Sequence, residues 1–560
     1  MSEGEMLSPA LAAERRVGLR HGLLIVAALF LLIALPWLIC NQELSRQEGL
    51  FAAITAEFST SSWQPEQGLI VRAHHQPVSD AWPLYPAVVS LLCRAGMPVE
   101  NALRTVSVVM LGLLSLLAGA AAGMRSGKTA GLVAGCCCFS TVFAMQKSVI
   151  GGPETMAAFF LFSAQLLFFH YGSRRADWNS AWIASAILVS LGFLAAGPLV
   201  VAFFVVPLIF LRRPLSFSGK FRTPGFAAGI ILLGVVVLAW AFPFGTALRQ
   251  YAVKSGFEII SFHKYMKNVL TFLPVFPVRM LPWSLVMWMP FCVALQAISP
   301  VPVFSRYLRT LFFPTLALVW LLPGTSSAQI FFLLGPLSVL TGLDYELGVR
   351  RYGRTLRRLL AVCWAFFPVA VFVIALIVLL PERFLGIFGD PRNMMFRDQP
   401  GYLMLAAGAA AVLGLLAVVY RYGFRWYPIW VPVAMLSFGI GVMRLADALP
   451  YHLMDNGWRR FGGDVRRVLP EGTPKIYKYE IDGMYCGLFY VGLPVHKLRQ
   501  LEDLDGLDDT VYLISSRLPV YPDRVWTPLF PRDYTCRGTP VSVWRGVRPD
   551  ERELPEESHE

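Results

Sequence analysis

Three acidic residues are the side chains in this chain best placed to do proton-transfer chemistry. Glu48 follows Gln47 at the start of an apolar helical stretch, and Asp80 and Glu154 stand beside proline-containing turns. A carboxylate acts as a general base when it lies within hydrogen-bond reach of the proton that it removes. Each acid also has a structural interpretation. A helix N-terminus stabilises a carboxylate at Glu48 or Glu154, and Asp80 is a typical turn residue.

Basic side chains gather in two clusters that could hold a phosphate. The first contains Arg72, His74 and His75, the second contains His263, Lys264 and Lys267, and Arg46 precedes the Glu48 helix. Fixed cations stabilise negative charge as it develops on a departing phosphate. At a membrane surface, however, basic residues more often attract anionic lipid without specificity. Adjacent histidines rarely converge on one ion, so we assign no metal site and no certain cofactor, and a divalent-metal requirement stays open.

The elements that must position these residues are membrane helices. Of 560 residues, 56% are hydrophobic and only 15% are charged, whereas soluble domains are about one quarter charged. Apolar stretches of about 17–25 residues can cross the hydrocarbon layer of a bilayer. We predict about thirteen such helices, at roughly 21–40, 102–122, 129–147, 154–171, 180–195, 197–211, 225–243, 281–298, 307–322, 328–343, 359–381, 402–420 and 427–444.

The basic residues predict an orientation for these helices. Arg15, Arg16 and Arg20 precede the first span, which has no small-x-small cleavage site and is typical of a retained signal anchor. With the N-terminus in the cytoplasm, every predicted inner loop carries arginine, as the positive-inside rule requires. The same rule explains the net charge of +13 without a nucleic-acid partner. Thirteen crossings leave the C-terminal segment outside.

Three segments lie outside the predicted spans. Residues 41–101 form a long outward loop with helices near 46–58 and 84–95, both expected at the membrane interface. Residues 244–280 form a second outward loop. Residues 451–560 alternate strands and helices, which predicts a small extracytoplasmic α/β domain following a membrane domain of residues 1–450. Cys486 and Cys536 in this C-terminal segment could form a disulfide or remain free.

Several short motifs occur in the order known from one family of membrane enzymes. Gln47-Glu48-Gly49-Leu50 opens the first outward helix, Asp80-Ala81-Trp82-Pro83 precedes the second, and Trp240-Ala-Phe-Pro-Phe-Gly245 and Leu281-Pro-Trp283 follow. The layout resembles the polytopic GT-C glycosyltransferases, specifically the protein O-mannosyltransferase and lipid A aminoarabinose transferase group. The resemblance covers nearly the whole chain and implies a GT-C-like fold with an outer C-terminal domain.

The chain departs from this family where the family's chemistry is expected. The first acid of the family's acidic pair, its proposed base, is Gln47 here. The family's helix arginine falls on Leu50, and its lysine before the proline falls on Trp82. An Asp-Pro at the start of the fourth span becomes Gly152-Pro153, with Glu154 one place later, and a later Lys-Gly becomes Ala196-Gly197.

The resemblance implies an enzyme of the bacterial inner membrane. It would transfer a sugar from a polyprenyl-phosphate donor to a lipid, protein or glycan acceptor at the outer face, with Glu48, Asp80 or Glu154 as catalytic carboxylate. Arg46 and the two basic clusters would bind the carrier phosphate. The altered motif also fits a catalytically silent relative that binds the lipid carrier or scaffolds envelope glycan assembly. A transporter is disfavoured, because the sequence shows no ionisable residues or broken helices within related repeats.

Overall fold

The structure is a computed structural model that describes most of the chain. The described residues are 9–39, 43–60, 71–78, 81–211, 221–241, 262–322, 327–379, 400–423, 428–453, 457–481, 484–498, 500–504, 509–521, 523–530, 535–536 and 539–548. They belong to two compact units. The helical unit comprises Met1–Cys40, Arg104–Val149 and Pro153–Tyr451, and the mixed unit comprises Asn41–Leu103, Ile150–Gly152 and His452–Glu560.

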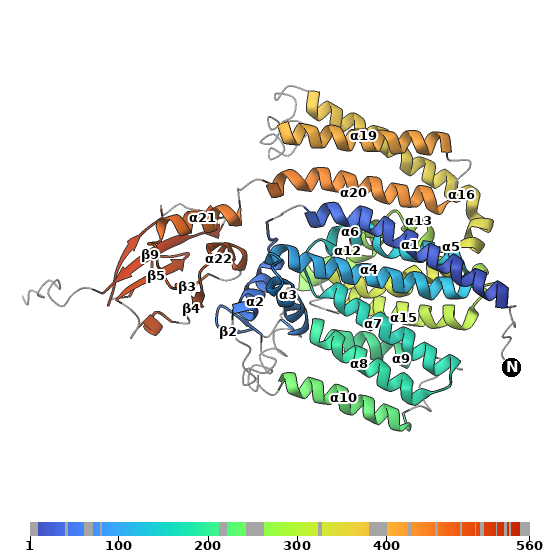
Figure 1. The fold of residues 1–560 in the computed structure, drawn as a ribbon, viewed down its shortest axis with the longest axis horizontal. Coiled ribbons are helices and arrows are strands. Elements are labelled where there is room, and N and C mark those ends of the chain that lie inside the picture. Colours follow the sequence, from blue (N-terminus) through green and yellow to red (C-terminus); the bar gives the residue numbers. More distant parts are fainter. Residues whose placement is uncertain are drawn as a thin grey trace, which may run out of the picture. The chain divides into compact units, whose positions relative to one another are not determined.

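The helical unit is a bundle whose longer helices run roughly parallel (Figure 1). The first turn of α4 belongs to the mixed unit and the rest to the bundle. Its helices are α1 (Pro9–Ile39), α4 (Val99–Ser126), α5 (Lys128–Phe139), α6 (Val142–Ser148), α7 (Glu154–Phe169), α8 (Trp178–Ala196), α9 (Pro198–Ile209), α10 (Pro224–Ala241), α12 (Phe262–Arg279), α13 (Ser284–Met287), α14 (Val293–Gln296), α15 (Pro302–Leu321), α16 (Phe331–Leu379), α19 (Pro400–Gly423) and α20 (Trp430–Leu453).

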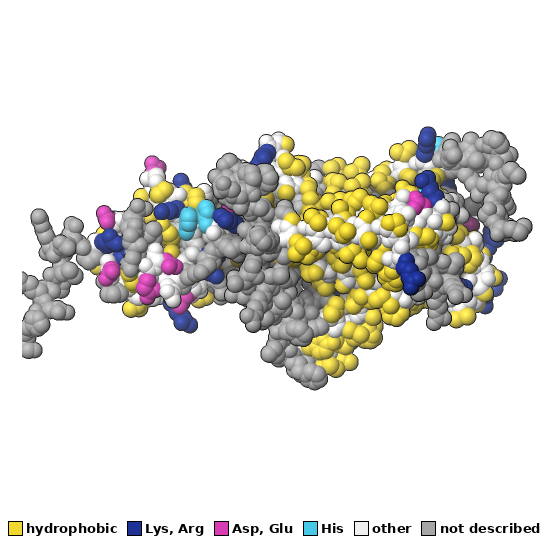
Figure 2. Space-filling view, turned by 90° about the horizontal axis from the view of Figure 1, so that it is seen from below, with side chains coloured by type: hydrophobic (Ala, Val, Ile, Leu, Met, Phe, Trp, Pro, Cys, Tyr) yellow, Lys and Arg dark blue, Asp and Glu magenta, His cyan; other side chains and the backbone are white. Residues whose placement is uncertain are grey.

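Six of the described helices are long and apolar enough to cross a membrane, or up to eight if each bent helix pair is one span. Figure 2 shows a broad hydrophobic face on this unit, as expected for side chains in contact with lipid. Leucine, isoleucine, valine and phenylalanine side chains on α1, α10, α16 and α19 are exposed in the structure. The chain is therefore a multi-pass helical protein, and the figure of about thirteen spans stays a prediction.

Helix α16 replaces two predicted spans and the arginine-rich loop between them. It continues through Arg350, Arg351, Arg354, Arg357 and Arg358 without a break. Arginine and leucine are good helix formers, and no proline interrupts this stretch. At about 1.5 Å per residue, 49 residues extend about 74 Å, well beyond the hydrocarbon layer. The arginines therefore lie along a helix rather than in a loop.

Two bent helix pairs meet at their breaks, contrary to the expectation of unbroken spans. α5 and α6 bend by 54°, and the segments around α12 and α13 bend by 105°. Trp283 is fully buried and its indole N–H donates to Ser140 Oγ at 2.7 Å. The Val142 N–H donates to the Leu281 carbonyl at 2.8 Å. Polar groups at each break therefore form hydrogen bonds with groups at the other break. Non-helical backbone inside a membrane bundle is tolerated only when its polar groups have such partners.

Glycines let α4 and α5 approach closely. A Cβ on Gly131 would lie 2.9 Å from the Gly119 carbonyl oxygen and 3.2 Å from Gly123 Cα. Small residues at such crossings let helix backbones pack without intervening side chains, a common arrangement in membrane bundles. The glycines of these two apolar stretches therefore let α5 pack directly against α4.

The mixed unit combines segments from both ends of the chain. Its elements are α2 (Glu48–Thr60), β1 (Arg72–Ala73), β2 (Gln76–Pro77), α3 (Leu84–Arg94), α21 (Trp458–Val468), β3 (Ile476–Tyr479), α22 (Tyr485–Val491), β4 (Val495–Lys497), β5 (Thr510–Ser515), β6 (Val525–Pro528), β7 (Thr535–Cys536), β8 (Thr539–Pro540) and β9 (Ser542–Val547). One sheet has the order β4-β3-β5-β9-β6. β3 runs parallel to β4 and β5, whereas β9 is antiparallel to its neighbours.

Residues 41–103 group with the C-terminal segment rather than with the membrane helices. The two-domain prediction divided the chain at residue 450 and left this loop in the membrane domain. Hydrophobic periodicity identifies the helices of the loop but carries no information about which distant segment they contact.

Candidate functional site

The acidic segment forms the first turn of α2. The backbone N–H groups of Glu48 and Gly49 both donate to the Ser45 carbonyl, at 3.0 and 3.2 Å. The Glu48 side chain reaches back, and its Oε2 accepts a hydrogen bond from the Ser45 N–H at 2.7 Å. This is the carboxylate half of a capping box, which satisfies an N–H at the helix start. Arg46 and Gln47 are exposed on the same turn.

Glu48 is buried and holds a second segment of the chain. Its side chain is 1% exposed, and Oε1 accepts a hydrogen bond from the Gly151 N–H at 2.8 Å. A methyl group at Gly151 would lie 2.7 Å from Leu103 Cβ and 3.2 Å from the Tyr85 hydroxyl. That hydroxyl donates to the Leu103 carbonyl at 2.8 Å. Glu48, Gly151 and Tyr85 therefore form one buried cluster around the start of α2.

The strand-like approach to α2 is tied to the C-terminal helices of the same unit. The Leu44 N–H donates to the Tyr490 hydroxyl at 2.9 Å, and Cys486 Sγ donates to the Ser45 carbonyl at 3.1 Å. Neither Cys486 nor Cys536 forms a disulfide in the structure, in agreement with the thiol alternative. Cys486 instead packs against Gly49, where a side chain would collide with it.

The other two predicted carboxylates lie elsewhere. Asp80 lies outside the described residues. Glu154 is the first residue of α7 in the helical unit and is half-buried. Within the described residues, Glu48 is therefore the only one of the three acids in the mixed unit.

The first basic cluster forms a hairpin turn. Ala73 pairs with Gln76 across β1 and β2, which leaves His74 and His75 as a two-residue loop. Both have positive φ, 55° and 61°. The His75 N–H donates to Glu57 Oε1 at 2.8 Å, whereas Arg72 is half-buried on β1.

Aromatic rings from the C-terminal segment stack on both histidines. The His75 ring lies 4.1 Å from that of His496 with an interplanar angle of 12°. The His74 ring lies 5.2 Å from that of Tyr485 at 21°. Lys478 Nζ lies 4.6 Å from the centre of the Tyr485 ring. The structure thus joins the hairpin to basic residues that sequence reasoning missed, because they lie roughly 400 residues later and have no motif of their own.

The environment of His74 disfavours its protonated form. Burial, reinforced by the charges of Lys478 and Lys497 and by neighbouring imidazoles, lowers the pKa of His74 to about 3. Burial also lowers the pKa of His496, with further contributions from His75 and Lys475. A buried imidazole loses its proton readily because the charged form is poorly solvated. At neutral pH, His74 is therefore a hydrogen-bonding group rather than a cation.

The second basic cluster lies partly outside the described side chains. His263 and Lys264 begin α12, but their side chains fall outside the described residues, and Lys267 is exposed on the same helix. The outward loop predicted over 244–280 is thus helical from Phe262. The amphipathic composition of this stretch hid the helix from hydropathy analysis.

Buried charges in the helical unit were also missed by sequence reasoning. Arg309 lies 3.4 Å from Asp344, whose side chain is fully buried. Ser299 Oγ donates to the other carboxylate oxygen at 2.9 Å. Arg104, near the start of α4, is only 3% exposed. Charges inside a membrane bundle are costly, so such residues are candidates for functional roles, and an ionisable residue within an apolar stretch is the signal that identifies them.

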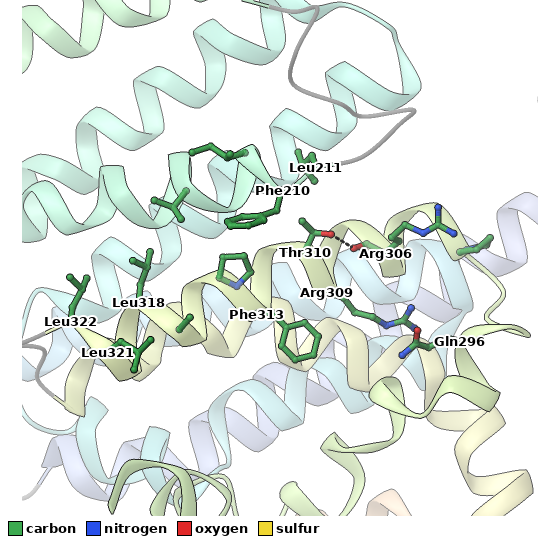
Figure 3. A pocket seen from close by; sticks show the side chains of 15 residues that line it. Phe210, Leu211, Gln296, Arg306, Arg309, Thr310, Phe313, Leu318, Leu321 and Leu322 are labelled. Atoms are coloured by element: carbon green, nitrogen blue, oxygen red, sulfur yellow. Dashed lines mark hydrogen bonds between the residues drawn. The ribbon is translucent and has the colours of Figure 1, made fainter. Parts of the chain in front are cut away.

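A groove in the helical unit has the dimensions and lining of a lipid site. It has a volume of about 990 Å³ and lies along α15 and the end of α9. Figure 3 shows Arg306, Arg309 and Gln296 at one end and Leu318, Leu321 and Leu322 at the other. An apolar trough with polar groups at one end suits an amphiphile.

Among the described residues, no three histidine, cysteine or acidic side chains are placed to hold a metal ion together. The residues that could bind a ligand are therefore the imidazoles and lysines of the mixed unit and the arginines of the groove.

Comparison with solved structures identifies the fold. No protein-family model matches the chain, and no curated protein matches it by sequence. The crystal structure of ArnT from Cupriavidus metallidurans bound to undecaprenyl phosphate aligns with a TM-score of 0.65 and 15% identity, over 93% of this chain and 97% of ArnT. Its apo state aligns with a TM-score of 0.66 and 16% identity, over the same shares. The Archaeoglobus fulgidus oligosaccharyltransferase aligns with a TM-score of 0.45 and 12% identity, over 86% of this chain and 64% of that one.

The ArnT alignment spans nearly the full length of both chains, so it includes segments of both the helical and the mixed unit. The chain therefore has the GT-C fold of this lipid A aminoarabinose transferase, as the order of its sequence motifs predicted.

Proposed function

We propose that the protein is a membrane glycosyltransferase that transfers a sugar from a polyprenyl-phosphate donor to an acceptor at the outer face of the bacterial inner membrane. The observation that carries the proposal is the full-length likeness to ArnT, whose structure holds undecaprenyl phosphate. The proposed orientation has the N-terminus in the cytoplasm and the mixed unit outside. Lipid, protein and glycan acceptors all present the nucleophile that such a reaction needs.

Glu48 is the proposed general base. One Glu48 oxygen accepts a backbone hydrogen bond from Ser45 and the other accepts one from Gly151. The two N–H groups fix the carboxylate at the head of α2. Because Glu48 is 1% exposed, the residues around it would have to move for an acceptor to reach it.

The groove along α15 supports a lipid-linked donor. A polyprenyl chain is apolar and flexible, and the leucines and phenylalanines of the groove give it a surface within the membrane bundle. In the mixed unit we propose Arg46 and Arg72 for the carrier phosphate. In the helical unit the α12 residues His263, Lys264 and Lys267 are a separate candidate set. Asp80 and Glu154 stay as alternative carboxylates.

A specific observation favours a second function, a catalytically silent protein that binds the lipid carrier or scaffolds glycan assembly. Two positions that are cationic in the family hold apolar side chains here. Leu50 packs against the buried cluster that contains Ala53 and Ile54, and Trp82 is 5% exposed. These residues contribute to the packing of the mixed unit and supply no charge.

A transfer assay with matched variants tests the enzyme. The full chain in lipid nanodiscs would receive radiolabelled polyprenyl-phosphate sugars, with membrane extract as the acceptor source. Glu48→Gln should lower transfer by about 100-fold or more, the usual contribution of a general base. Tyr85→Phe is the control, because it removes a hydrogen bond from the same buried cluster and leaves the carboxylate. Equal losses in both variants would assign Glu48 a structural role only.

The same assay separates the enzyme from the silent protein. Carrier binding by the wild type without any transfer would support the silent function. Gln47→Asp then restores the acid of the family pattern at an exposed position. If only this variant transfers sugar, the fold can support the reaction once an acid stands at position 47, and Glu48 is not the base. Asp80→Asn and Glu154→Gln, measured beside it, assign the remaining two carboxylates.

A further inference from the structure

A second cavity, separate from the Glu48 cluster, lies within the mixed unit. It has a volume of about 630 Å³, in the range of small-molecule sites. The hairpin turn, one face of α2, the end of α22 and the start of β4 line it. We call it the histidine pocket, after His74, His75 and His496.

The turn that carries two of these histidines is locally unfavourable. Two-residue hairpin loops with positive φ at both positions strongly prefer Asn-Gly, because a side chain in the left-handed region costs about 1 kcal/mol or more. His74 and His75 both adopt this conformation. Strained backbone of this kind persists where the surrounding structure holds it, and it concentrates at ligand sites. The imidazoles therefore have a role that Asn-Gly would not supply.

One imidazole nitrogen in the pocket is buried without a partner. His74 is 6% exposed, and its Nδ1 makes no hydrogen bond. Buried polar atoms in native proteins are nearly always paired, so an exception needs an explanation. Because the pKa of His74 is lowered to about 3, the ring is neutral and can donate to or accept from a bound group. A ligand in the pocket would supply the missing partner.

The charges around the pocket favour an anion. Lys475 lines it, and the charges of Lys478 and Lys497 act on His74 from the same sheet. Glu57 is the acidic residue among its lining side chains, and its Oε1 already accepts the His75 N–H. The remaining lining is largely apolar and includes Leu488, Phe489 and Val495. The ligand should therefore combine negative charge with an apolar part.

We propose that the histidine pocket binds a phosphate monoester attached to an apolar group, with the phosphate at His74 and the neighbouring His75, His496 and Lys475, and the apolar part against Leu488, Phe489 and Val495. This proposal rests on the proposed function only for the source of the ligand. The lipid carrier released after transfer and a phosphorylated lipid acceptor both carry a phosphate on an apolar group. The histidine pocket is a different site from the one that contains Glu48, the proposed base.

Equilibrium dialysis of the full chain in nanodiscs tests the pocket. Radiolabelled geranyl phosphate represents the carrier, a hexosamine 1-phosphate represents a phosphorylated acceptor, and inorganic phosphate represents the head group alone. Geraniol, which lacks the phosphate, is the ligand control. Geranyl phosphate should bind more tightly than inorganic phosphate if the apolar lining contributes. Tightest binding of the hexosamine phosphate, which has no apolar part, would reject the proposed contact with Leu488, Phe489 and Val495.

Three variants locate the binding. Lys475→Met leaves the turn intact, His496→Gln removes one imidazole, and the double variant H74N/H75G gives the turn its preferred residues. Each should raise the dissociation constant about tenfold, the loss expected from one charge-assisted hydrogen bond. Arg466→Ala, an exposed cation on α21, is the control and should change nothing. No binding by any phosphate probe, or equal loss in the control, overturns the proposal.

The outcome is independent of catalysis. Sugar transfer without phosphate binding at the pocket would reject this inference and leave the proposed function standing. Phosphate binding without transfer would support the pocket and favour the silent protein.

Discussion

Two buried polar sites in the mixed unit satisfy their hydrogen bonds in opposite ways. The carboxylate of Glu48 is held by backbone N–H groups from two segments, Ser45 and Gly151. The imidazole of His74 is equally buried, but its Nδ1 is unpaired and its backbone is strained. A buried polar group that the protein itself satisfies stabilises the fold, whereas one left unpaired costs free energy until a ligand arrives. The first site therefore organises the unit, and the second has capacity to bind.

Removing the carboxylate should have the largest effect on stability. Glu48→Ala leaves the N–H groups of Ser45 and Gly151 without that acceptor, which costs about 3 kcal/mol in total. Chemical denaturation of the purified protein measures the change. Gln47→Ala, on the exposed side of the same turn, should stay within about 0.5 kcal/mol of wild type. A similar loss in both variants would contradict an organising role for Glu48.

Filling the space at Gly151 should cost somewhat less. Gly151→Ala places a methyl group 2.7 Å from Leu103 Cβ, so the backbone must move away from Glu48. Overpacking of this kind costs about 2 kcal/mol. Gly463→Ala on α21 is the control, because an added Cβ there meets nothing within 4 Å. A thermal midpoint unchanged by Gly151→Ala would show that the contact relaxes freely.

Acidic pH should lower the free energy of unfolding through protonation of His74. The pKa of His74 is lowered to about 3 in the folded protein, so the unfolded chain takes up the proton first. The stability from neutral His74 is complete above pH 6.5 and is lost as the pH falls toward 3. Lowering the pH from 7.5 to 5.5 should cost about 1.4 kcal/mol. His74→Asn should flatten this dependence, and an unchanged slope in that variant would assign the titration to other groups.

The smallest effect on stability is expected from exchanging the turn. The double variant H74N/H75G relieves the left-handed strain but loses ring stacking on Tyr485 and His496. These terms are each about 1 kcal/mol and oppose one another. Denaturation should therefore show a net change below about 1 kcal/mol, although phosphate binding is weakened about tenfold. A loss well above that value would mean that the histidines serve packing rather than binding.

The helices and their approximate order could be predicted from the sequence, since a run of apolar residues long enough to cross a bilayer identifies itself. The α2 helix, with Glu48 at its start, and the helix at 84–95 were also found. The sequence did not predict that α16 is one continuous helix. Hydropathy averages treat a charged stretch as a loop, even where arginine and leucine favour a helix. The breaks near Ser140 and Leu281 were missed because their compensation is tertiary.

The chain's own residue order determined the membrane character, the motif order that resembles the GT-C family, and the altered acidic pair at Gln47 and Glu48. Only the tertiary structure decided what these residues contact. Gly151 reaches Glu48 from 103 positions away, and His496 stacks on His75 from across most of the chain. Periodicity and charge pattern act over a few turns of backbone, whereas partners of buried polar groups are chosen by packing between distant segments.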